Sequence, residues 1–346
     1  MKLLVLGGTR FLGRHAVDAA LARGYDVTIF TRGRIAPPWG DRVRHLVGDR
    51  DPAKSPGLDA LMEGDWDAVI DTSGYVPRCV QASAQALSAR VRHCVFVSSL
   101  SVYAEPTAPG ADESAPLAVL GDPASEEILR DYGALKAACE REVAAAFGES
   151  RAALVRPGLI VGPFDGTDRF GYWVARFVHP NLLCARPDAI VVPSPRERPV
   201  QFIDARDLAR FLLDLCEQRI AGTFNACSER GQWTMGMLVD ALVAAREGRA
   251  PEVCWIDDAT LLAASVEPWI GLPLWIPASD VASAGFMEVD CRRAHRAGLA
   301  ERTLAATIAD TAAWLAMRDN SGAWQHVLTA GSERALIERA HRAATR

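Results

Sequence analysis

The feature that most constrains the fold is the regular alternation of short apolar runs with helical stretches through the first half of the chain. Buried parallel strands read as short continuous apolar runs, whereas amphipathic helices repeat their apolar residues every three or four positions. The apolar runs are KLLVLG, VTIF, RHLVGD, DAVIDT, HCVFVSS and AALVRPGLIVG. Helical patterns lie between them near 12–23, 57–64, 77–89 and 126–147, and Gly24 is placed as a helix C-cap. This order predicts an α/β fold built on a doubly wound parallel sheet.

The pattern changes after about residue 165, which predicts a second and smaller unit. Seven of the nine tryptophans fall in this part of the chain. The runs VQFIDARDLARFLLDLCE and GTFNAC read as a return to the main sheet, so the two units are expected to be interleaved. The expected division is a sheet domain of residues 1–165 with about 200–228, a substrate-binding domain of residues 166–199 and 229–318, and a C-terminal helical extension, 319–346.

Composition places the chain among ordinary globular proteins and argues against several functional classes. The 346 residues carry a formal net charge of −5, which does not favour nucleic acid or an anionic membrane surface. No apolar run approaches the length that spans a bilayer. The eight cysteines are scattered without a C-x-x-C pair, so we expect reduced thiols, no disulfide and no metal site. We therefore expect a cytoplasmic protein with no nucleic-acid or membrane partner.

The segment GGTRFLG follows the first apolar run and opens the first helix. Glycines in such a turn allow backbone N–H groups and the helix N-terminus to approach a pyrophosphate. A merely tight strand-to-helix turn is the structural alternative. The segment departs from the usual glycine spacing because Arg10 stands where a glycine is common. The cofactor contacts expected from this loop are Gly7, Thr9, Arg10, Phe11, Leu12 and Gly13.

The end of the second apolar run, VTIFTRGR, bears on which dinucleotide is bound. An NAD-specific site usually has an acidic residue here for the ribose 2′-hydroxyl. Arg32 and Arg34 stand there instead, and a guanidinium can bind a 2′-phosphate through two hydrogen bonds. We therefore expect NADP(H) in preference to NAD(H), with solvated surface arginines as the alternative reading. The further cofactor contacts expected at the ends of later strands are Asp49, Arg50, Thr72, Ser73, Gly74 and Pro157.

Tyr132 and Lys136 stand four residues apart in DYGALKAACE, which places both side chains on one face of the expected helix. Lys136 is one of only three lysines among 38 basic residues. A phenol exchanges a proton near neutral pH only if its pKa of about 10 falls by about three units. A lysine ammonium about 5 Å away contributes about 3 kcal/mol at an effective dielectric of about 20. We expect Tyr132 to be the general acid or base, with Lys136 as its electrostatic partner and Ser99 as a hydrogen-bond donor to substrate. A half-buried tyrosine beside a solvated lysine is the structural alternative.

The motifs GGTRFLG, SSLSVY, YGALK, RPGLIVGP and VQFIDARDLA resemble, in this order, those of the extended short-chain dehydrogenase/reductase family. This family is also called the NAD-dependent epimerase/dehydratase family, and the resemblance runs from residue 2 to about 316. It implies a Rossmann-type domain that binds NAD(P), a smaller C-terminal substrate domain and, commonly, a homodimer. It also implies that Ser99 is the catalytic serine, with Ser101 as a second contact.

Three departures from the family pattern bear on the substrate. Leu159 and Val200 stand where many nucleotide-sugar members carry an asparagine and an arginine that contact the substrate. Leu100 and Ser101 stand where the 4,6-dehydratase branch carries an Asp-Glu pair. The Arg10 form of the glycine loop is similar to that of the chloroplast stem-loop RNA-binding members. The two missing polar contacts, at Leu159 and Val200, favour a small metabolite that is not a nucleotide sugar, and the missing Asp-Glu pair argues against dehydration.

Three functions remain open from the sequence. The first is an NADP(H)-dependent oxidoreductase that acts on a carbonyl/alcohol pair of a small metabolite; the second is an NAD-dependent sugar epimerase. The third, of another class, is a non-catalytic RNA-binding member of the fold.

A long segment at 104–127 is expected to be a lid or binding loop, and the tryptophans Trp269 and Trp275 either line an aromatic pocket or belong to the core. The residues expected to contact substrate are Ser101, Tyr75, Arg169 and Trp173.

Overall fold

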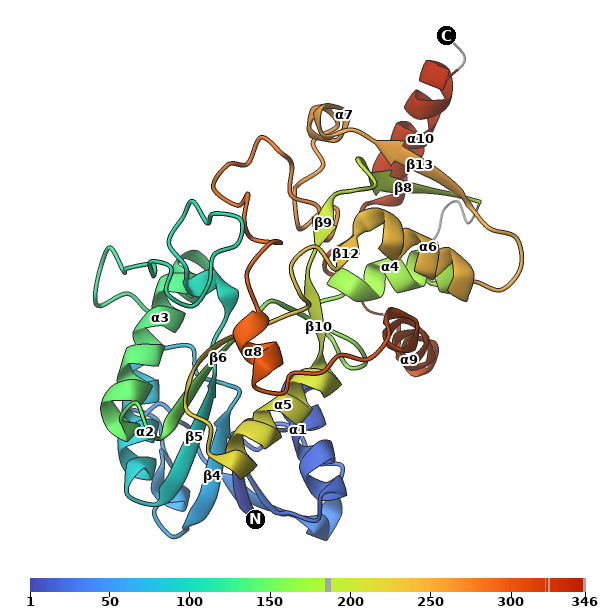
Figure 1. The fold of residues 1–346 in the computed structure, drawn as a ribbon. Helices are drawn as coiled ribbons and strands as arrows, with labels where there is room; N and C mark the ends of the chain where they lie inside the picture. The colour runs from blue at the N-terminus through green and yellow to red at the C-terminus, as the bar shows by residue number, and fades with distance from the viewer. Residues whose placement is uncertain (184–187, 321, 323, 345–346) are drawn as a thin grey trace.

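A seven-stranded parallel sheet forms the centre of the N-terminal part of the protein (Figure 1). The computed structural model describes residues 1–183, 188–320, 322 and 324–344. The strand order is β11-β6-β5-β4-β1-β2-β3, so the chain reverses its direction of winding between β1 and β4. This is the doubly wound sheet that the alternation of runs predicts. The strands are β1 (Lys2–Leu6), β2 (Asp26–Thr31), β3 (Val43–Val47), β4 (Trp66–Asp71), β5 (Val91–Val97), β6 (Ala152–Pro157) and β11 (Gly222–Ala226).

Helices cover both faces of this sheet (Figure 1). Leu3 and Val5 of β1 pack with one pair of helices, whereas Leu4 and Leu6 pack with the other pair. Successive side chains of a strand point to opposite faces, so a strand buried on both faces needs an apolar residue at every position. The first pair is α1 (Phe11–Ala22) and α5 (Ala205–Gln218), and the second is α2 (Pro77–Ser88) and α3 (Ile128–Phe147).

Two elements differ from the sequence-based expectation. The helix expected at 57–64 is a single 3-10 turn, η2 (Asp59–Leu61), between Gly57, which has a φ of +62°, and Gly64. The run AALVRPGLIVG divides at Gly158 into β6 and β7 (Leu159–Val161), and β7 leaves the main sheet to pair with β10 (Phe202–Asp204). A Cβ at position 158 would lie 2.5 Å from the Sγ of Cys227, so glycine allows the close approach at which the chain leaves the sheet.

The C-terminal part has its own apolar cluster, which includes Trp173 and Trp275 and is separate from the two clusters on the main sheet. Its strands form further two-stranded sheets, β9–β12 and β8–β13. The cluster also includes Leu159 and Val200, expected in the sheet domain, and Leu336 of the expected C-terminal extension, so the exact division into domains stays a prediction. These elements are β8 (Ala189–Pro193), β9 (Pro199–Val200), β12 (Trp233–Thr234), β13 (Glu252–Ile256), α4 (Arg169–Val178), α6 (Met235–Ala245), α7 (Asp258–Ala263), α8 (Arg292–Arg296), α9 (Leu304–Met317) and α10 (Ala330–Ala344).

The last helix, α10, packs on β8 and β13 and is anchored by a buried ion pair. Glu333 accepts a hydrogen bond from Arg176 of α4 at 2.7 Å, and both side chains are buried. Seven cysteines are described and all of them are buried; Cys184 lies outside the described residues. Within the described ranges, no helix has the length and apolar character needed to cross a membrane.

Candidate active site

A cavity of about 1040 Å³ lies at the carboxyl ends of the main-sheet strands. Ligands bind at this edge in open α/β sheets, where the order of strands reverses. The cavity is as large as the largest pockets that hold a single small ligand, about 1,000 Å³. Its walls come from the segments after β1 to β6 and, at one end, from residues of the C-terminal part. It is thus suited to an extended ligand with a second molecule beside it.

The glycine loop forms one wall of the cavity, and its glycines are required by geometry. Gly7 has a φ of +106°, and a Cβ there would lie 2.5 Å from the Oγ1 of Thr72. A Cβ on Gly13 would lie 2.6 Å from the backbone nitrogen of Gly8. No side chain caps the N-terminus of α1 and its first turn contains no acidic residue. The loop therefore fits the phosphates of a dinucleotide, because it lines the cavity at an uncapped helix N-terminus, which favours an anion.

The segment after β2 carries positive charge on the cavity wall. Arg32 and Arg34 are exposed and line the cavity together with Arg10 and Lys54. Thr31 is the last residue of β2, and its hydroxyl pairs with His45 at 2.8 Å. No acidic residue follows β2 at the position that binds the ribose 2′-hydroxyl in NAD-specific sites.

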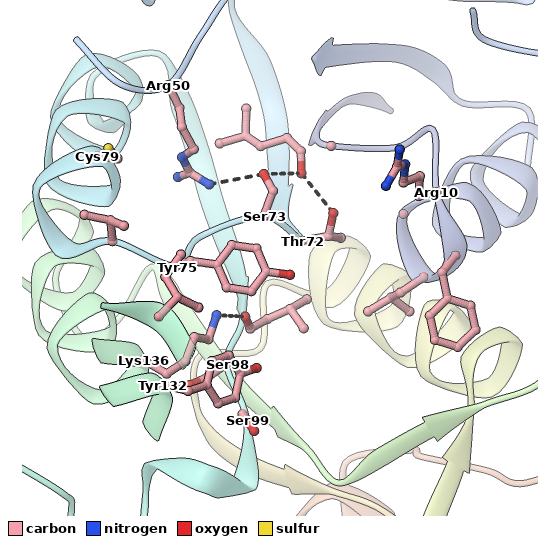
Figure 2. Close-up of a pocket in the computed structure, with 18 of the residues that line it drawn as sticks. Arg10, Arg50, Thr72, Ser73, Tyr75, Cys79, Ser98, Ser99, Tyr132 and Lys136 are labelled. Carbon is pink, nitrogen blue, oxygen red and sulfur yellow. Dashed lines mark hydrogen bonds between the residues drawn. The ribbon is translucent and has the colours of Figure 1, made fainter. Parts of the chain in front are cut away.

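Arg50, expected to contact the cofactor, is instead held mainly by the protein. Its guanidinium makes two hydrogen bonds to Asp71, at 2.8 and 2.7 Å, and further ones to Ser73 and Ser83. Burial acts to raise the pKa of Asp71, but the Arg50 charge and hydrogen bonds lower it below its usual range. Arg50 still lines the cavity, and Figure 2 shows it joined to Ser73 above the centre of the pocket. It fixes the segment after β4 against the segment after β3.

Ser99, Tyr132 and Lys136 converge at the end of the cavity away from Arg10 (Figure 2). Ser99 follows β5, and its hydroxyl oxygen accepts a hydrogen bond from the backbone N–H of Ser101 at 3.1 Å. Lys136 is only 3% exposed, and its Nζ donates to the carbonyl oxygens of Gly74 and Val97 at 2.6 and 2.7 Å. The arrangement rules out the alternative in which Lys136 is a solvated surface residue.

The charges at this end differ from the sequence-based expectation. Burial raises the pKa of Tyr132. A hydrogen bond with the Ser99 hydroxyl and the charge of Arg169 act in the opposite direction and lower it. Burial lowers the pKa of Lys136 to about 8. The pKa of Tyr132 is thus raised rather than lowered, and the expected lowering by Lys136 together with a bound nicotinamide stays a prediction. The physical reason is that Lys136 donates to two backbone carbonyls and that both side chains are desolvated.

Gly133 is a site residue that the sequence analysis missed. It lies in α3 directly after Tyr132, and a Cβ there would lie 1.9 Å from the carbonyl oxygen of Ser101. Only glycine lets α3 approach the Ser99–Ser101 turn this closely. A glycine inside a helix lowers helix stability by about 1 kcal/mol relative to alanine. A glycine at position 133 of an expected helix is therefore the signal that could have identified this residue.

The tryptophans divide between the cavity and the core. Trp269 lines the cavity with Phe286 and Arg169, whereas Trp275 is fully buried in the cluster of the C-terminal part. Trp173, which we expected to contact substrate, is also fully buried and donates from its indole N–H to the carbonyl of Pro273 at 3.1 Å. The expected contact between Trp173 and substrate is wrong, because Trp173 lies on the face of α4 that packs into the apolar cluster of the C-terminal part.

The long segment at 104–127 does not lie over the chemistry as expected. Only its end contributes to the cavity, through Glu126. The part near Thr107 is bonded instead to the segment before α8: Thr107 N to Ala282 O at 3.2 Å and Gly110 N to Glu288 O at 2.7 Å. Backbone hydrogen bonds to the C-terminal part therefore hold this loop beside the cavity rather than over it.

Most of the expected site residues come together around the one cavity. Gly74 does not line it, because its position is packed against Phe96 and its carbonyl accepts from Lys136. Leu159 lines the cavity where many nucleotide-sugar members have a polar residue, and Val200 is buried in β9. The expected residues that line the cavity are Gly7, Thr9, Arg10, Phe11, Leu12, Gly13, Arg32, Asp49, Arg50, Thr72, Ser73, Tyr75, Ser99, Ser101, Tyr132, Lys136, Pro157 and Arg169.

The fold and cavity define a protein of the NAD(P)-binding Rossmann class, and comparison with known proteins identifies the family. A model of the NAD dependent epimerase/dehydratase family matches residues 3–227. The chain belongs to this family of NAD-dependent enzymes, which is the extended short-chain dehydrogenase/reductase family expected from its motifs.

Two relatives with reductase names and one solved structure are similar to the chain. It is 30% identical over 190 residues to the 2-alkyl-3-oxoalkanoate reductase of Stenotrophomonas maltophilia (strain K279a), covering 48% of this chain and 52% of that protein. The chain thus spans about half the length of that relative. It is 29% identical over 287 residues to the ceramide reductase of Caulobacter vibrioides (strain NA1000 / CB15N), covering 78% of each. Its fold is similar to that of the UDP-glucuronic acid 4-epimerase of Bacillus cereus in complex with NAD, with a TM-score of 0.62, 16% identity and coverage of 92% and 99%.

Proposed function

We propose that the protein is an NADP(H)-dependent reductase or dehydrogenase that acts on the carbonyl/alcohol pair of a small metabolite other than a nucleotide sugar. The observation that carries the proposal is the convergence of Ser99, Tyr132 and buried Lys136 at one end of a cavity whose other end is the glycine loop. The reductase names of the two relatives support the same reaction class.

The proposed roles follow from where each group lies. A bound nicotinamide cofactor supplies the hydride for the carbonyl carbon and is itself oxidised. Tyr132 transfers its hydroxyl proton to the carbonyl oxygen, and Ser99 donates a hydrogen bond to that oxygen as negative charge develops on it. Burial raises the pKa of Tyr132, so the phenol is protonated at neutral pH but is a weaker acid than a free tyrosine; the Ser99 hydroxyl and the Arg169 charge oppose this change. Lys136 holds the ends of β4 and β5 together through Gly74 and Val97.

The proposed preference for NADP(H) rests on charge at the end of β2. Arg32 and Arg34 are exposed on the wall that would face the ribose, Arg10 and Lys54 lie on the same cavity, and no acid follows the strand. A guanidinium bound to a phosphate contributes about 1.5–3 kcal/mol, or about tenfold to a hundredfold in affinity.

Titration of the protein with NADPH and NADH, followed by the fluorescence of the reduced nicotinamide, tests this preference. We expect NADPH to bind at least about tenfold more tightly than NADH, and Arg32→Gln to weaken NADPH alone by about tenfold. Arg92→Gln, which removes the same charge at an exposed position outside the cavity, is the matched control and should change neither affinity. Tighter binding of NADH, or stoichiometric NAD released on denaturation, would contradict the preference and favour the sugar epimerase.

The subunit arrangement and location stay predictions. We propose a homodimer, as is common in the family, and a cytoplasmic location without nucleic-acid or membrane partners. Light scattering of the purified protein tests the first of these, and salt-dependent binding to RNA would argue for the non-catalytic alternative.

A further inference from the structure

Arg169 presents an unpaired guanidinium at the end of the cavity that holds Tyr132. It is the first residue of α4, it is half-buried, and it lines the cavity together with Trp269 and Phe286. Its Nε donates to the Oγ1 of Thr167 at 3.1 Å. Over the described part of the chain, neither of its Nη atoms has a hydrogen-bond or ion-pair partner. The two parallel donors that arginine uses to bind anions are therefore available.

The guanidinium is oriented by the protein. Asp165 accepts hydrogen bonds at one carboxylate oxygen from the backbone N–H and the hydroxyl of Thr167, at 2.8 and 2.7 Å. Because the Thr167 hydroxyl donates its proton to Asp165, its oxygen is turned to accept from Arg169. Asp168, the N-cap residue of α4, accepts a hydrogen bond from Arg318 at 2.5 Å. A side chain fixed in this way loses little freedom when it binds a ligand.

The charge of Arg169 is not neutralised by the nearest acid. Asp165 is 3% exposed, and its second carboxylate oxygen has no partner, yet no ion pair joins it to Arg169 among the described residues. Desolvation lowers the pKa of Arg169, and Asp165 and Tyr132 oppose that change. An incompletely paired charge in a partly buried place is unfavourable, and an anionic ligand would offset the cost.

An apolar wall stands beside this cation. The Arg169 guanidinium carbon lies 5.6 Å from the centre of the Trp269 ring, which meets Phe286 edge-on at 5.5 Å. Trp269 has a φ of +66°, a left-handed conformation that is unusual for a bulky residue. Such strain is found where the position of a side chain matters for binding or catalysis. The wall can hold an apolar chain next to the bound anion.

We propose that the substrate is an oxo acid whose carboxylate is bound by the two Nη atoms of Arg169 and whose apolar chain lies against Trp269 and Phe286. Its ketone then faces Tyr132 and Ser99. A carboxylate fits better than a phosphate, because one guanidinium balances its single charge, whereas a phosphate monoester carries about −1.5 to −2 at pH 7 and would need a second cation. Among the other cations on the cavity wall, Arg50 and Arg78 are ion-paired with acids and Lys136 donates to backbone carbonyls. The remaining ones lie on the segments after β1, β2 and β3 and are Arg10, Arg32, Arg34 and Lys54. This inference rests on the proposed function, since it names the substrate class of the same site.

The test compares 3-oxooctanoate with its methyl ester, which has the same ketone and chain but no charge. Turnover is followed as oxidation of NADPH, and binding of each compound is measured by calorimetry in the presence of NADP⁺. Wild type is compared with Arg169→Gln, with Arg169→Lys and with Arg92→Gln as the charge-matched control away from the cavity. Thermal melting and NADPH affinity of each variant show whether it is folded and binds cofactor.

We expect wild type to prefer the acid over the ester, and Arg169→Gln to lower kcat/KM for the acid by about tenfold to a hundredfold while the ester changes less than about threefold. Arg169→Lys should restore only part of the loss, because an ammonium lacks the planar fork. Equal losses for acid and ester, or equal turnover of both by wild type, would overturn the inference and leave the proposed reduction intact. Arg169-dependent binding of the acid without NADPH oxidation would support the inference and contradict the reduction. Neither binding nor turnover of the acid would overturn the inference, and the reduction itself is then judged by turnover of the uncharged ester.

Discussion

The buried charge of Lys136 helps to organise the site, but its desolvation lowers the stability of the fold. The amine is buried, donates to the carbonyls of Gly74 and Val97, and lies 4.3 Å from the centre of the Phe96 ring. Desolvation disfavours the ammonium form and lowers its pKa to about 8, whereas the usual value is about 10.4. A lysine ammonium is a compact group with three donors, which suits two carbonyls in a small space and fits the use of lysine here in a chain that mostly uses arginine.

This pKa predicts how stability depends on pH. Between pH 8 and pH 10.4 the folded protein holds fewer protons at Lys136 than the unfolded chain, so its unfolding free energy rises with pH over that interval. Lys136→Met removes the titrating group. We expect the unfolding free energy of wild type, relative to the variant, to increase by about 3 kcal/mol from neutral pH to about pH 10.5.

Urea unfolding of both proteins over this pH range measures the difference directly. A difference that stays flat or falls as the pH rises would contradict a lysine with a lowered pKa. Loss of turnover in the variant at every pH is expected in addition, but it does not bear on the sign of the stability change.

Among the elements, α3 is the one whose placement decides the site. Its backbone departs from helical geometry at Asp131, directly before Tyr132, and Gly133 meets the carbonyl of Ser101. The contact sets the separation between the tyrosine and the serine turn. We expect Gly133→Ala to push α3 away, to lower turnover at least about tenfold and to lower the unfolding free energy by about 1–3 kcal/mol, as overpacking does.

Gly121→Ala is the matched control for this change. Gly121 lies in the preceding loop, has no positive φ, and a Cβ there would meet nothing within 4 Å. The control should leave turnover and thermal melting near the wild-type values. A Gly133→Ala protein with wild-type activity would show that α3 does not depend on this contact.

Some elements of the fold could be predicted from the sequence, and others could not. The glycine loop, the strand runs and the Tyr132/Lys136 pair are local patterns, and the structure has each of them near its expected bounds. The exit of β7 from the main sheet could not be read, because it depends on Gly158 meeting Cys227, which lies far along the chain. The burial of Trp173 and the position of the loop at 104–127 likewise depend on contacts with the C-terminal part.

For the whole molecule, the arrangement of two parts around one cavity explains how the chemistry is assembled (Figure 1). The main sheet supplies the glycine loop, Ser99 and the helix that carries Tyr132. The C-terminal part supplies Arg169, Trp269 and Phe286 at the same end. In the proposed function, the contacts to cofactor and the contacts to substrate would therefore come from parts with separate apolar cores, so a substitution in one set is expected to have little effect on the other.

The central claim is that Tyr132 transfers a proton to substrate while the rest of the cavity binds NADP(H). It is tested most directly by measuring NADPH oxidation by wild type and by Tyr132→Phe with the ketone that wild type reduces fastest, together with the NADPH affinity of both proteins. We predict that Tyr132→Phe binds NADPH as wild type does and loses about a hundredfold to ten-thousandfold in kcat. A variant that binds NADPH normally and retains wild-type kcat would contradict the claim.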